Sequence, residues 1–213
     1  MIEPALIIVA DFPEFVVVDK PAGLLSVPGR TPNLQDCITE RVKVRYPQTI
    51  AQPAVHRLDM DTSGLMVVAK TTDTHRVLSK QFIGRSVEKK YVALLDGVVQ
   101  GERGTIELPF RLDPEARPQQ VYDLVHGKMG TTHWRRLAVE GGRTRVEFTP
   151  VTGRTHQLRL HASHEKGLGC PIKGDRLYGT NVNDERLCLH ACFLSFDHPQ
   201  TGERLTFTSP VPF

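Results

Sequence analysis

The stretch HRLDMDTSGLMVVAK, residues 56–70, joins a dense polar cluster to a run of apolar residues. The apolar part, residues 65–69, is short and β-branched, as expected of a buried strand. The polar part combines two carboxylates and an arginine with Thr, Ser and Gly, which favour turns. The polar part is the densest polar cluster of the chain, and it lies directly before the predicted strand.

The segments around this stretch predict a strand-rich fold. FVVVDK, residues 15–20, is β-branched and runs into the turn-forming sequence PAG. Asn33 is expected to cap a helix over 34–46 that Pro47 closes, and a second helix is expected over 73–82 with its stop at Gly84. A short third helix is expected over 155–163. Further strands are expected over 91–95, 104–108, 131–139, 144–149, 188–196 and 205–208.

Turn sequences between these strands imply hairpins. Glu140-Gly141-Gly142 separates two predicted strands, and His198-Pro199 with Gly202 separates another two. We therefore predict an α+β fold with a large mixed, mostly antiparallel sheet flanked by helices and loops. No linker divides the sequence, so a single domain over residues 1–213 is expected.

Composition limits the kinds of protein that this chain can be. Hydrophobic residues at 39% and charged residues at 24% exclude a disordered or fibrous chain. The longest apolar runs fall far short of the roughly 18 residues that cross a bilayer, so no membrane partner is expected. Four cysteines are too few for a disulfide scaffold; we interpret them as buried thiols and expect a cytoplasmic protein.

The charge distribution permits, but does not require, a surface that binds phosphates. The net charge is +3, and basic residues gather in 85–90, 135–136 and 173–176. A basic face of this kind suits a polyanionic partner, and an ordinary solvated surface explains it equally well.

The polar cluster itself has several interpretations. Asp59, Asp61, Ser63 and Gly64 occupy positions one, three, five and six of a calcium-binding EF-hand loop. Position twelve is Lys70, where a bidentate glutamate is required, and an apolar strand follows where a helix should stand. Calcium binding is therefore disfavoured.

Two further interpretations stay open on the residues alone. Asp59 and Asp61 could be the carboxylate pair of a glycoside hydrolase, although Trp134, the single tryptophan, offers a poor sugar-binding platform. The acids could also be plain turn and capping residues. Arg57 beside Asp59 favours a functional role, because an arginine keeps a nearby carboxylate ionised and able to act as a nucleophile.

The stretch from His56 to Lys70 closely resembles the signature of the RluA-type pseudouridine synthase family. The resemblance covers nearly the whole chain. The chain is similar to the short branch of the family, which lacks the small N-terminal RNA-binding domain that many members carry. The other matching motifs, in family order, are DKPAG (19–23), EKKYVALL (88–95), TGRTHQLRLH (152–161), GDRLYG (174–179) and LHACFLSFDHP (189–199).

This resemblance implies a pseudouridine synthase catalytic fold with a central active-site cleft. The implied reaction isomerises uridine to pseudouridine in structured RNA, by detaching the base, turning it and rejoining it through carbon. Asp59 matches the nucleophile, which would attack either the anomeric carbon or the pyrimidine ring. Arg154 matches the arginine that pairs with this aspartate. Tyr91 matches a tyrosine that stacks on the flipped base, and neither a metal nor a cofactor is expected.

The resemblance also implies how RNA is held. Arg57 matches an arginine that enters the space left by the flipped base. Lys20, Lys89 and Lys90 are candidates for contacts with the RNA backbone, because phosphates reward simple positive charge. The expected substrates are a tRNA anticodon stem-loop, a hairpin of the large-subunit (23S) rRNA, or both. No DNA partner is expected, and the chain is expected to be a monomer.

Two alternatives remain beside this hypothesis. One is a catalytically silent RNA-binding or assembly protein of the same fold. The other is a glycoside hydrolase, which would need a second carboxylate near Asp59. A metal site built from histidines and cysteines is disfavoured by the spacing. Cys188 and Cys192 on one strand would lie about 13 Å apart, too far to bind one ion.

Overall fold

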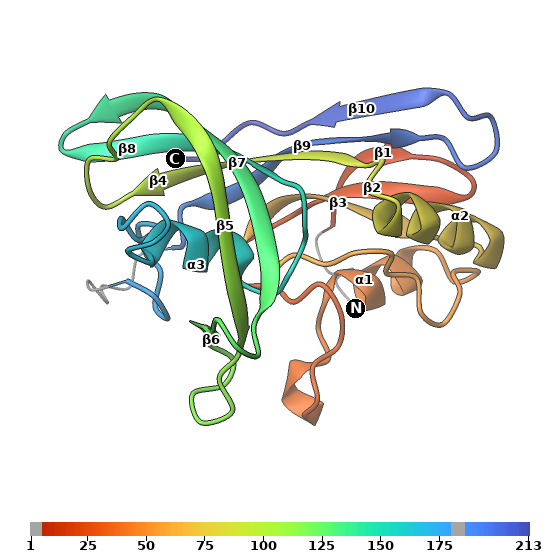
Figure 1. The fold of residues 1–213 in the computed structure, drawn as a ribbon. Helices are drawn as coiled ribbons and strands as arrows, with labels where there is room; N and C mark the ends of the chain where they lie inside the picture. The colour runs from red at the N-terminus through yellow and green to blue at the C-terminus, as the bar shows by residue number, and fades with distance from the viewer. Residues whose placement is uncertain (1–5, 180–185) are drawn as a thin grey trace. The chain divides into compact units, whose positions relative to one another are not determined.

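The computed structural model describes residues 6–179 and 186–213, and its contacts divide the chain into two compact units. Unit 1 comprises Met1–Lys89 and Ala191–Pro210, and unit 2 comprises Lys90–His190 and Val211–Phe213. Each unit contains several β-strands and at least one helix (Figure 1).

Unit 1 is built on strands in the order β1-β2-β3-β9, with β10 paired to β9. The pairs β1–β2, β2–β3 and β9–β10 are antiparallel. A short 3-10 helix precedes the first of two α-helices. The elements are β1 (Ile7–Asp11), β2 (Phe15–Lys20), η1 (Pro32–Leu34), α1 (Ile38–Arg45), β3 (Ser63–Ala69), α2 (Thr72–Ile83), β9 (Leu189–Asp197) and β10 (Arg204–Thr208).

Helices cover both faces of the β2–β3 pair, which explains why these strands are apolar throughout. Successive side chains of a strand point to opposite faces. Phe15 and Val17 pack in one cluster with Leu78 of α2. Val16 and Val18 pack in a second cluster that contains Ile38 and Val42 of α1. Because neither face meets water, every residue of β3 is buried.

The first helix begins later than predicted. Asn33 lies in the 3-10 turn, and α1 starts at Ile38 with Cys37 at its N-cap. Cys37 has an extended backbone and forms an isolated parallel bridge with Leu25. This pairing holds Cys37 itself extended, so the α-helix cannot run continuously from Leu34 through Cys37.

Among its described residues, unit 2 contains strands in the order β4-β8-β7-β5-β6 and one helix. The pairings of β4 with β8, β8 with β7, β7 with β5 and β5 with β6 are all antiparallel. The first two residues of β4 belong to unit 1. The elements are β4 (Glu88–Leu95), β5 (Arg103–Leu112), β6 (Gln120–Tyr122), β7 (Lys128–Glu140), β8 (Arg143–Pro150) and α3 (Gln157–Ser163).

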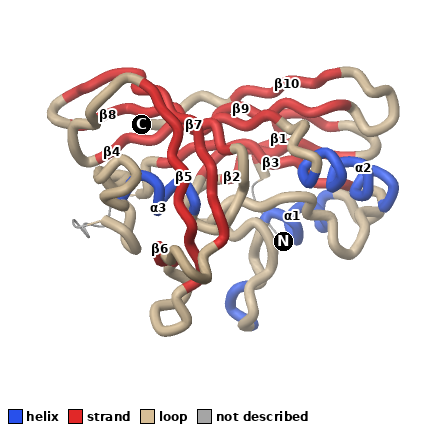
Figure 2. Tube along the Cα trace, viewed as in Figure 1, coloured by secondary structure: helices blue, strands red, loops and turns tan. Residues whose placement is uncertain are grey.

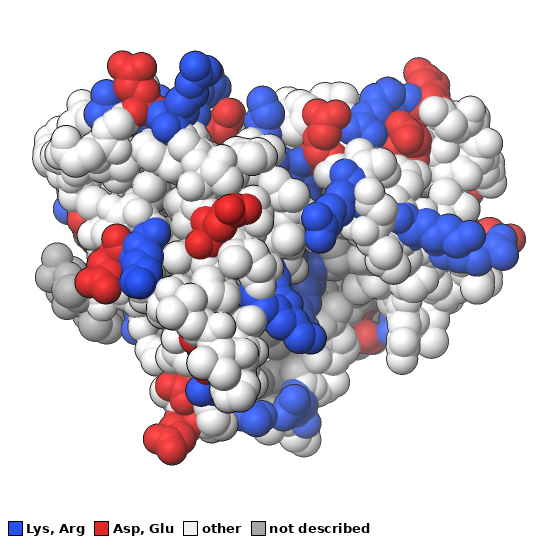
Figure 3. Space-filling model, viewed as in Figure 1, with Lys and Arg blue, Asp and Glu red and all other residues white. Residues whose placement is uncertain are grey.

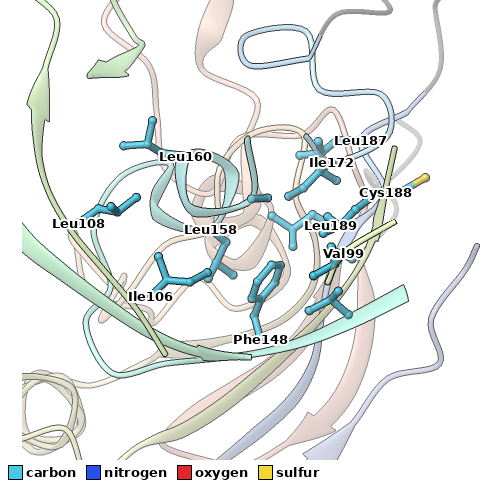
Figure 4. Packing of buried hydrophobic residues seen from close by; sticks show 14 of the residues in the cluster. Val99, Ile106, Leu108, Phe148, Leu158, Leu160, Ile172, Leu187, Cys188 and Leu189 are labelled. Carbon is cyan, nitrogen blue, oxygen red and sulfur yellow. The ribbon is translucent and has the colours of Figure 1, made fainter. Parts of the chain in front are cut away.

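The core of unit 2 lies between α3 and one face of its sheet (Figure 4). Leu158 and Leu160 of α3 pack in the same cluster as Ile106 of β5 and Phe148 of β8. Alternate residues of β5, such as Arg103 and Thr105, are exposed on the other face. One face of this sheet is therefore apolar and covered, whereas the other is open.

The α+β prediction is confirmed, with strands far more extensive than helices (Figure 2). The predicted strands and the hairpin at Glu140 are present, and α2 ends at Gly84 as expected. Strands β1 and β6 were not predicted, and α3 begins two residues later than expected, at Gln157. The single-domain prediction stays a prediction. Within the described ranges, no helix is long and apolar enough to cross a membrane.

The cysteines differ in part from the prediction of four buried thiols. Cys37 and Cys188 are buried, whereas Cys170 and Cys192 are only partly buried. Cys188 also lies just outside β9, so it does not share a strand face with Cys192.

Gly64 is required where β3 begins. Its φ is +115°, and an added Cβ would lie 2.3 Å from the carbonyl oxygen of Ala191 in β9. We expect Gly64→Ala to lower the free energy of unfolding, measured in urea, by at least about 3 kcal/mol. The control is Gly23→Ala, where φ is +82° but nothing lies within 4 Å, and which should cost about 1 kcal/mol. Equal losses in the two variants would contradict this account.

Candidate active site

The loop that carries Asp59 begins at an anchored histidine. Nε2 of His56 accepts a hydrogen bond from the backbone N–H of Val67 at 3.0 Å. Its ring stacks on Phe82 of α2, with ring centroids 4.5 Å apart. Burial, and secondarily the charge of Lys89, lowers the pKa of His56 to about 3. The ring is therefore neutral at physiological pH, as its acceptor role requires.

The residue before Asp59 is held by both of its backbone polar groups. The hydroxyl of Ser26 donates to the carbonyl of Leu58 at 2.7 Å, and the N–H of Leu58 donates to the same hydroxyl oxygen at 3.0 Å. Both residues are buried. Paired hydrogen bonds of this kind leave no backbone group unsatisfied at a buried position, and they fix the course of the loop.

Lys20 fastens the next part of the loop. Its side chain is 0% exposed, at the end of β2. The ammonium donates to the carbonyls of Pro21 at 2.9 Å, Leu24 at 2.6 Å and Met60 at 2.7 Å. The carbonyl of Met60 also accepts from the N–H of Gly23 at 2.9 Å. Three donors thus meet three acceptors, which joins the turn after β2 to the loop after Asp59.

Two features of the surroundings of Lys20 have opposite effects on its pKa. Burial lowers the pKa of Lys20 to about 8, while the negative charges of Asp61 and Asp59 act to raise it. At neutral pH the group is therefore mainly charged. The expected contact of Lys20 with RNA phosphates does not fit this environment, because its side chain is inaccessible and its donors are directed to carbonyls. The sequence-based assignment of Lys20 to RNA phosphates is therefore not supported by the structure.

Asp59 itself is half-buried on a loop that is held on either side of it. The N–H of Thr62 donates to the carbonyl of Asp59 at 3.1 Å, which closes a turn into β3. Asp61 is also half-buried, and Arg57 is exposed. The carboxylate of Asp59 therefore projects from a fixed backbone. The anchored positions alternate along the loop as His56, Leu58, Met60 and Thr62.

In unit 2, Arg154 is half-buried and positioned by its neighbours. Its backbone N–H donates to Oε1 of Gln157 at 3.2 Å, and its guanidinium donates to the carbonyl of Lys128 at 3.5 Å. The guanidinium also lies 5.6 Å from the ring centroid of Phe110, within the range of a cation–π contact.

Gln157 organises the loop before α3 and was missed by sequence reasoning. It is 3% exposed, and its amide nitrogen donates to the carbonyls of Thr131 and Thr152 and to the hydroxyl of Thr132. Its amide oxygen accepts from the hydroxyl of Thr152 at 2.7 Å. The available signal was a glutamine at the start of the helix, three positions after the candidate Arg154. Burial of a fully bonded amide makes this network rigid.

A buried ion pair connects the GDRLYG segment to α3. Arg159 donates to both carboxylate oxygens of Asp175, at 2.8 and 2.6 Å. Asp175 also accepts from the N–H groups of Leu177 and Tyr178, and the Tyr178 hydroxyl lies 2.9 Å from Nδ1 of His156. Such bidentate, fully bonded geometry is what a buried pair needs to offset its desolvation.

The remaining candidate residues are Lys89, which belongs to unit 1, and Lys90 and Tyr91, which belong to unit 2. Lys89 of unit 1 lies 5.8 Å from the Phe82 ring centroid, and burial lowers its pKa. In unit 2, Tyr91 packs partly buried against the core, and Lys90 lies 4.0 Å from a carboxylate oxygen of Glu147. Across residues 6–179 and 186–213, no three His, Cys, Asp or Glu side chains are grouped as a metal site requires.

Residues 14–164 match the family model described as RNA pseudouridylate synthase. This chain belongs to the RNA pseudouridylate synthase family. The match contains the loop of Asp59, β4 with Tyr91, and Arg154. The predicted family resemblance is confirmed.

Relatives match the synthase over nearly its full length. The Dual-specificity RNA pseudouridine synthase RluA of Haemophilus influenzae is 44% identical over 216 residues, which cover 100% of this chain and 96% of that protein. The protein of the same name in Escherichia coli is 40% identical over 215 residues, with 99% and 95% covered. The prediction of a pseudouridine synthase enzyme is confirmed.

Solved structures agree with this assignment. Human RNA Pseudouridylate Synthase Domain Containing 1 is similar with a TM-score of 0.77 and 31% identity, covering 98% of this chain and 84% of that one. Human RNA Pseudouridylate Synthase Domain Containing 4 has a TM-score of 0.76 and 27% identity, with 97% and 88% covered. The predicted pseudouridine synthase fold is confirmed.

The buried ammonium of Lys20 gives the synthase a pH-dependent stability. Its pKa of about 8 lies below the ordinary value of 10.5, so the folded protein releases this proton first. Between about pH 8 and 10.5 the unfolded chain binds more protons at Lys20 than the folded protein does, so this residue makes the free energy of unfolding increase with pH. Relative to Lys20→Met, wild type should gain up to about 3 kcal/mol over this range in urea unfolding. Parallel curves for the two proteins would contradict the assignment.

Proposed function

We propose that the synthase isomerises uridine to pseudouridine in structured RNA with the Asp59 carboxylate as nucleophile. The observation that carries this proposal is the anchoring of the Asp59 loop. The backbone is hydrogen-bonded at Leu58, Asp59 and Met60, and Asp59 as a residue is only partly buried. A nucleophile held in one geometry has already lost the entropy that a reaction in solution would have to overcome.

The proposed chemistry needs no redox partner. The bond from the ribose carbon to the pyrimidine nitrogen breaks, a bond to the ring carbon forms, that carbon loses a proton, and the nitrogen gains one. An ionised carboxylate can attack either the sugar or the ring. The Lys20 ammonium contributes a positive charge near Asp61 and Asp59.

Arg154 and Tyr91 complete the proposed catalytic set, on the strength of their motif matches. Arg154 is assigned to hold the Asp59 carboxylate, and the Gln157 network that fixes its backbone supports a role requiring a defined position. Tyr91 is assigned to stack on the flipped base. Both assignments come from the family resemblance.

Base flipping is assigned to Arg57, and backbone contacts are assigned to Lys89 and Lys90. Arg57 is exposed next to the anchored Leu58, so its planar guanidinium can reach a nucleotide that approaches Asp59. Taking a uridine out of a stack costs a few kcal/mol, which contacts of this kind offset.

The substrates are proposed from the relatives. Proteins named dual-specificity RNA pseudouridine synthase align with the chain from end to end, so we propose two RNA substrates. They are a tRNA anticodon stem-loop and a hairpin of large-subunit rRNA, both of which the protein would meet as a monomer in the cytoplasm. Recognition of unpaired loops and RNA shape suits both substrates.

The test is pseudouridine formation by purified protein on these two RNAs, measured by tritium release from 5-tritiated uridine. Asp59→Asn should reduce turnover by about 10³-fold or more on both RNAs, because the amide is not a nucleophile. The matched control is Asp61→Asn on the same loop, which should keep activity within about 10-fold.

Two outcomes would contradict the proposal. One is undiminished turnover by Asp59→Asn. The other is wild type that binds RNA without forming product, which would establish a catalytically silent RNA-binding protein of this fold.

A further inference from the structure

The open face of the unit 2 sheet carries a row of charged side chains in register. Arg103 of β5 is the Cα partner of Arg135 of β7, and Arg135 is the partner of Glu147 of β8. In the next row, Thr105 is the partner of His133. With Thr149, these residues line an open groove of about 520 Å³, called here the arginine groove.

Strand alternation separates the arginine groove from the core. Ile106, Leu108 and Phe110 face the cluster that contains α3, so Arg103 and Thr105 at odd positions face away from it. Trp134 packs against that core, and an added Cβ on Gly104 would lie 2.9 Å from its Nε1. The indole therefore packs beside Gly104 of β5, and both residues also count among those that line the arginine groove.

Two arginines placed directly opposite each other destabilise an antiparallel pair. Arg135 donates to a carboxylate oxygen of Glu147 at 3.1 Å. Over the part of the chain that the structure describes, Arg103 has no ion pair. Lys90 also lies 4.0 Å from Glu147, so two cations share one carboxylate while Arg103 is left without one among the described residues. This arrangement leaves excess positive charge that an anion would neutralise.

Neighbouring polar groups suit a sugar-phosphate chain. The Thr105 hydroxyl lies 2.9 Å from Nδ1 of His133, which orients the exposed imidazole. Thr149 lines the same groove. Guanidinium, imidazole and hydroxyl groups are the side-chain donors that contact phosphate and ribose oxygens. Trp134 is the one large apolar residue among those that line the groove, and the remaining side chains there are polar or charged.

We propose that the arginine groove binds the phosphate backbone of substrate RNA outside the nucleotide that is isomerised. This inference rests on the proposed function, because it extends the contact with the same RNA. The groove does not stand out as a large basic patch, because basic and acidic side chains are interspersed over the visible surface (Figure 3). The strand register is what brings the arginines together.

The test compares the double variant Arg103→Ala/Arg135→Ala with wild type by fluorescence anisotropy of the labelled stem-loop RNA. The dissociation constant should rise about 10-fold or more at 0.1 M salt, and the slope of log K against log salt should fall by about 1.5, for two lost phosphate contacts. Turnover at saturating RNA should be unchanged. The melting temperature should change little, because the variant removes a like-charge pair and, with it, one exposed ion pair of Arg135 with Glu147.

The matched control is Arg76→Ala/Lys80→Ala, which removes two exposed cations from α2 and should leave affinity and salt slope near wild type. An unchanged dissociation constant and salt slope in the groove variant would overturn the inference, as would an equal loss in the control. These results are separable from the proposed function. Wild type that forms no pseudouridine refutes the activity, while the difference in binding still decides the role of the groove.

Discussion

The Asp59 loop depends on one buried ammonium. Lys20 lies where β2 ends, and its three hydrogen bonds join the turn after that strand to the loop after Asp59. A lone buried charge would cost several kcal/mol, and full hydrogen bonding together with two nearby carboxylates offsets this cost. The position of Asp59 is thus determined by a residue that need not touch the substrate.

The sequence predicted the class of fold and the chemistry of the main motif, but it assigned Lys20 to the wrong environment. A lysine after a strand is usually solvated, and phosphate binding by such a lysine is a reasonable inference. The alternation of FVVVDK held the contrary signal, because Lys20 shares a strand face with Val16 and Val18, which face the α1 cluster. Where helices cover both faces of a sheet, the position of a residue along its strand decides its burial more than the residue type does.

Other differences arise from contacts that are distant in sequence. The late start of α1 follows from the bridge between Leu25 and Cys37, which no local propensity reports. Strand β1 is largely exposed, so it lacks a buried apolar pattern, and β6 has only three residues. The hydrogen bonds of Gln157 join residues up to 26 positions away, so its importance appears only after folding. The roles of Asp59, Tyr91 and Arg154 stay predictions from the family motifs.

Hydrogen exchange of the Asp59 loop tests most directly whether Lys20 holds it. The amides of Gly23 and Thr62 donate to the carbonyls of Met60 and Asp59, and they report the state of the loop. In Lys20→Met, these two amides should exchange at least about 10-fold faster than in wild type, while the amides of β3 keep their protection. Unchanged protection of both loop amides in a folded Lys20→Met variant would contradict the account.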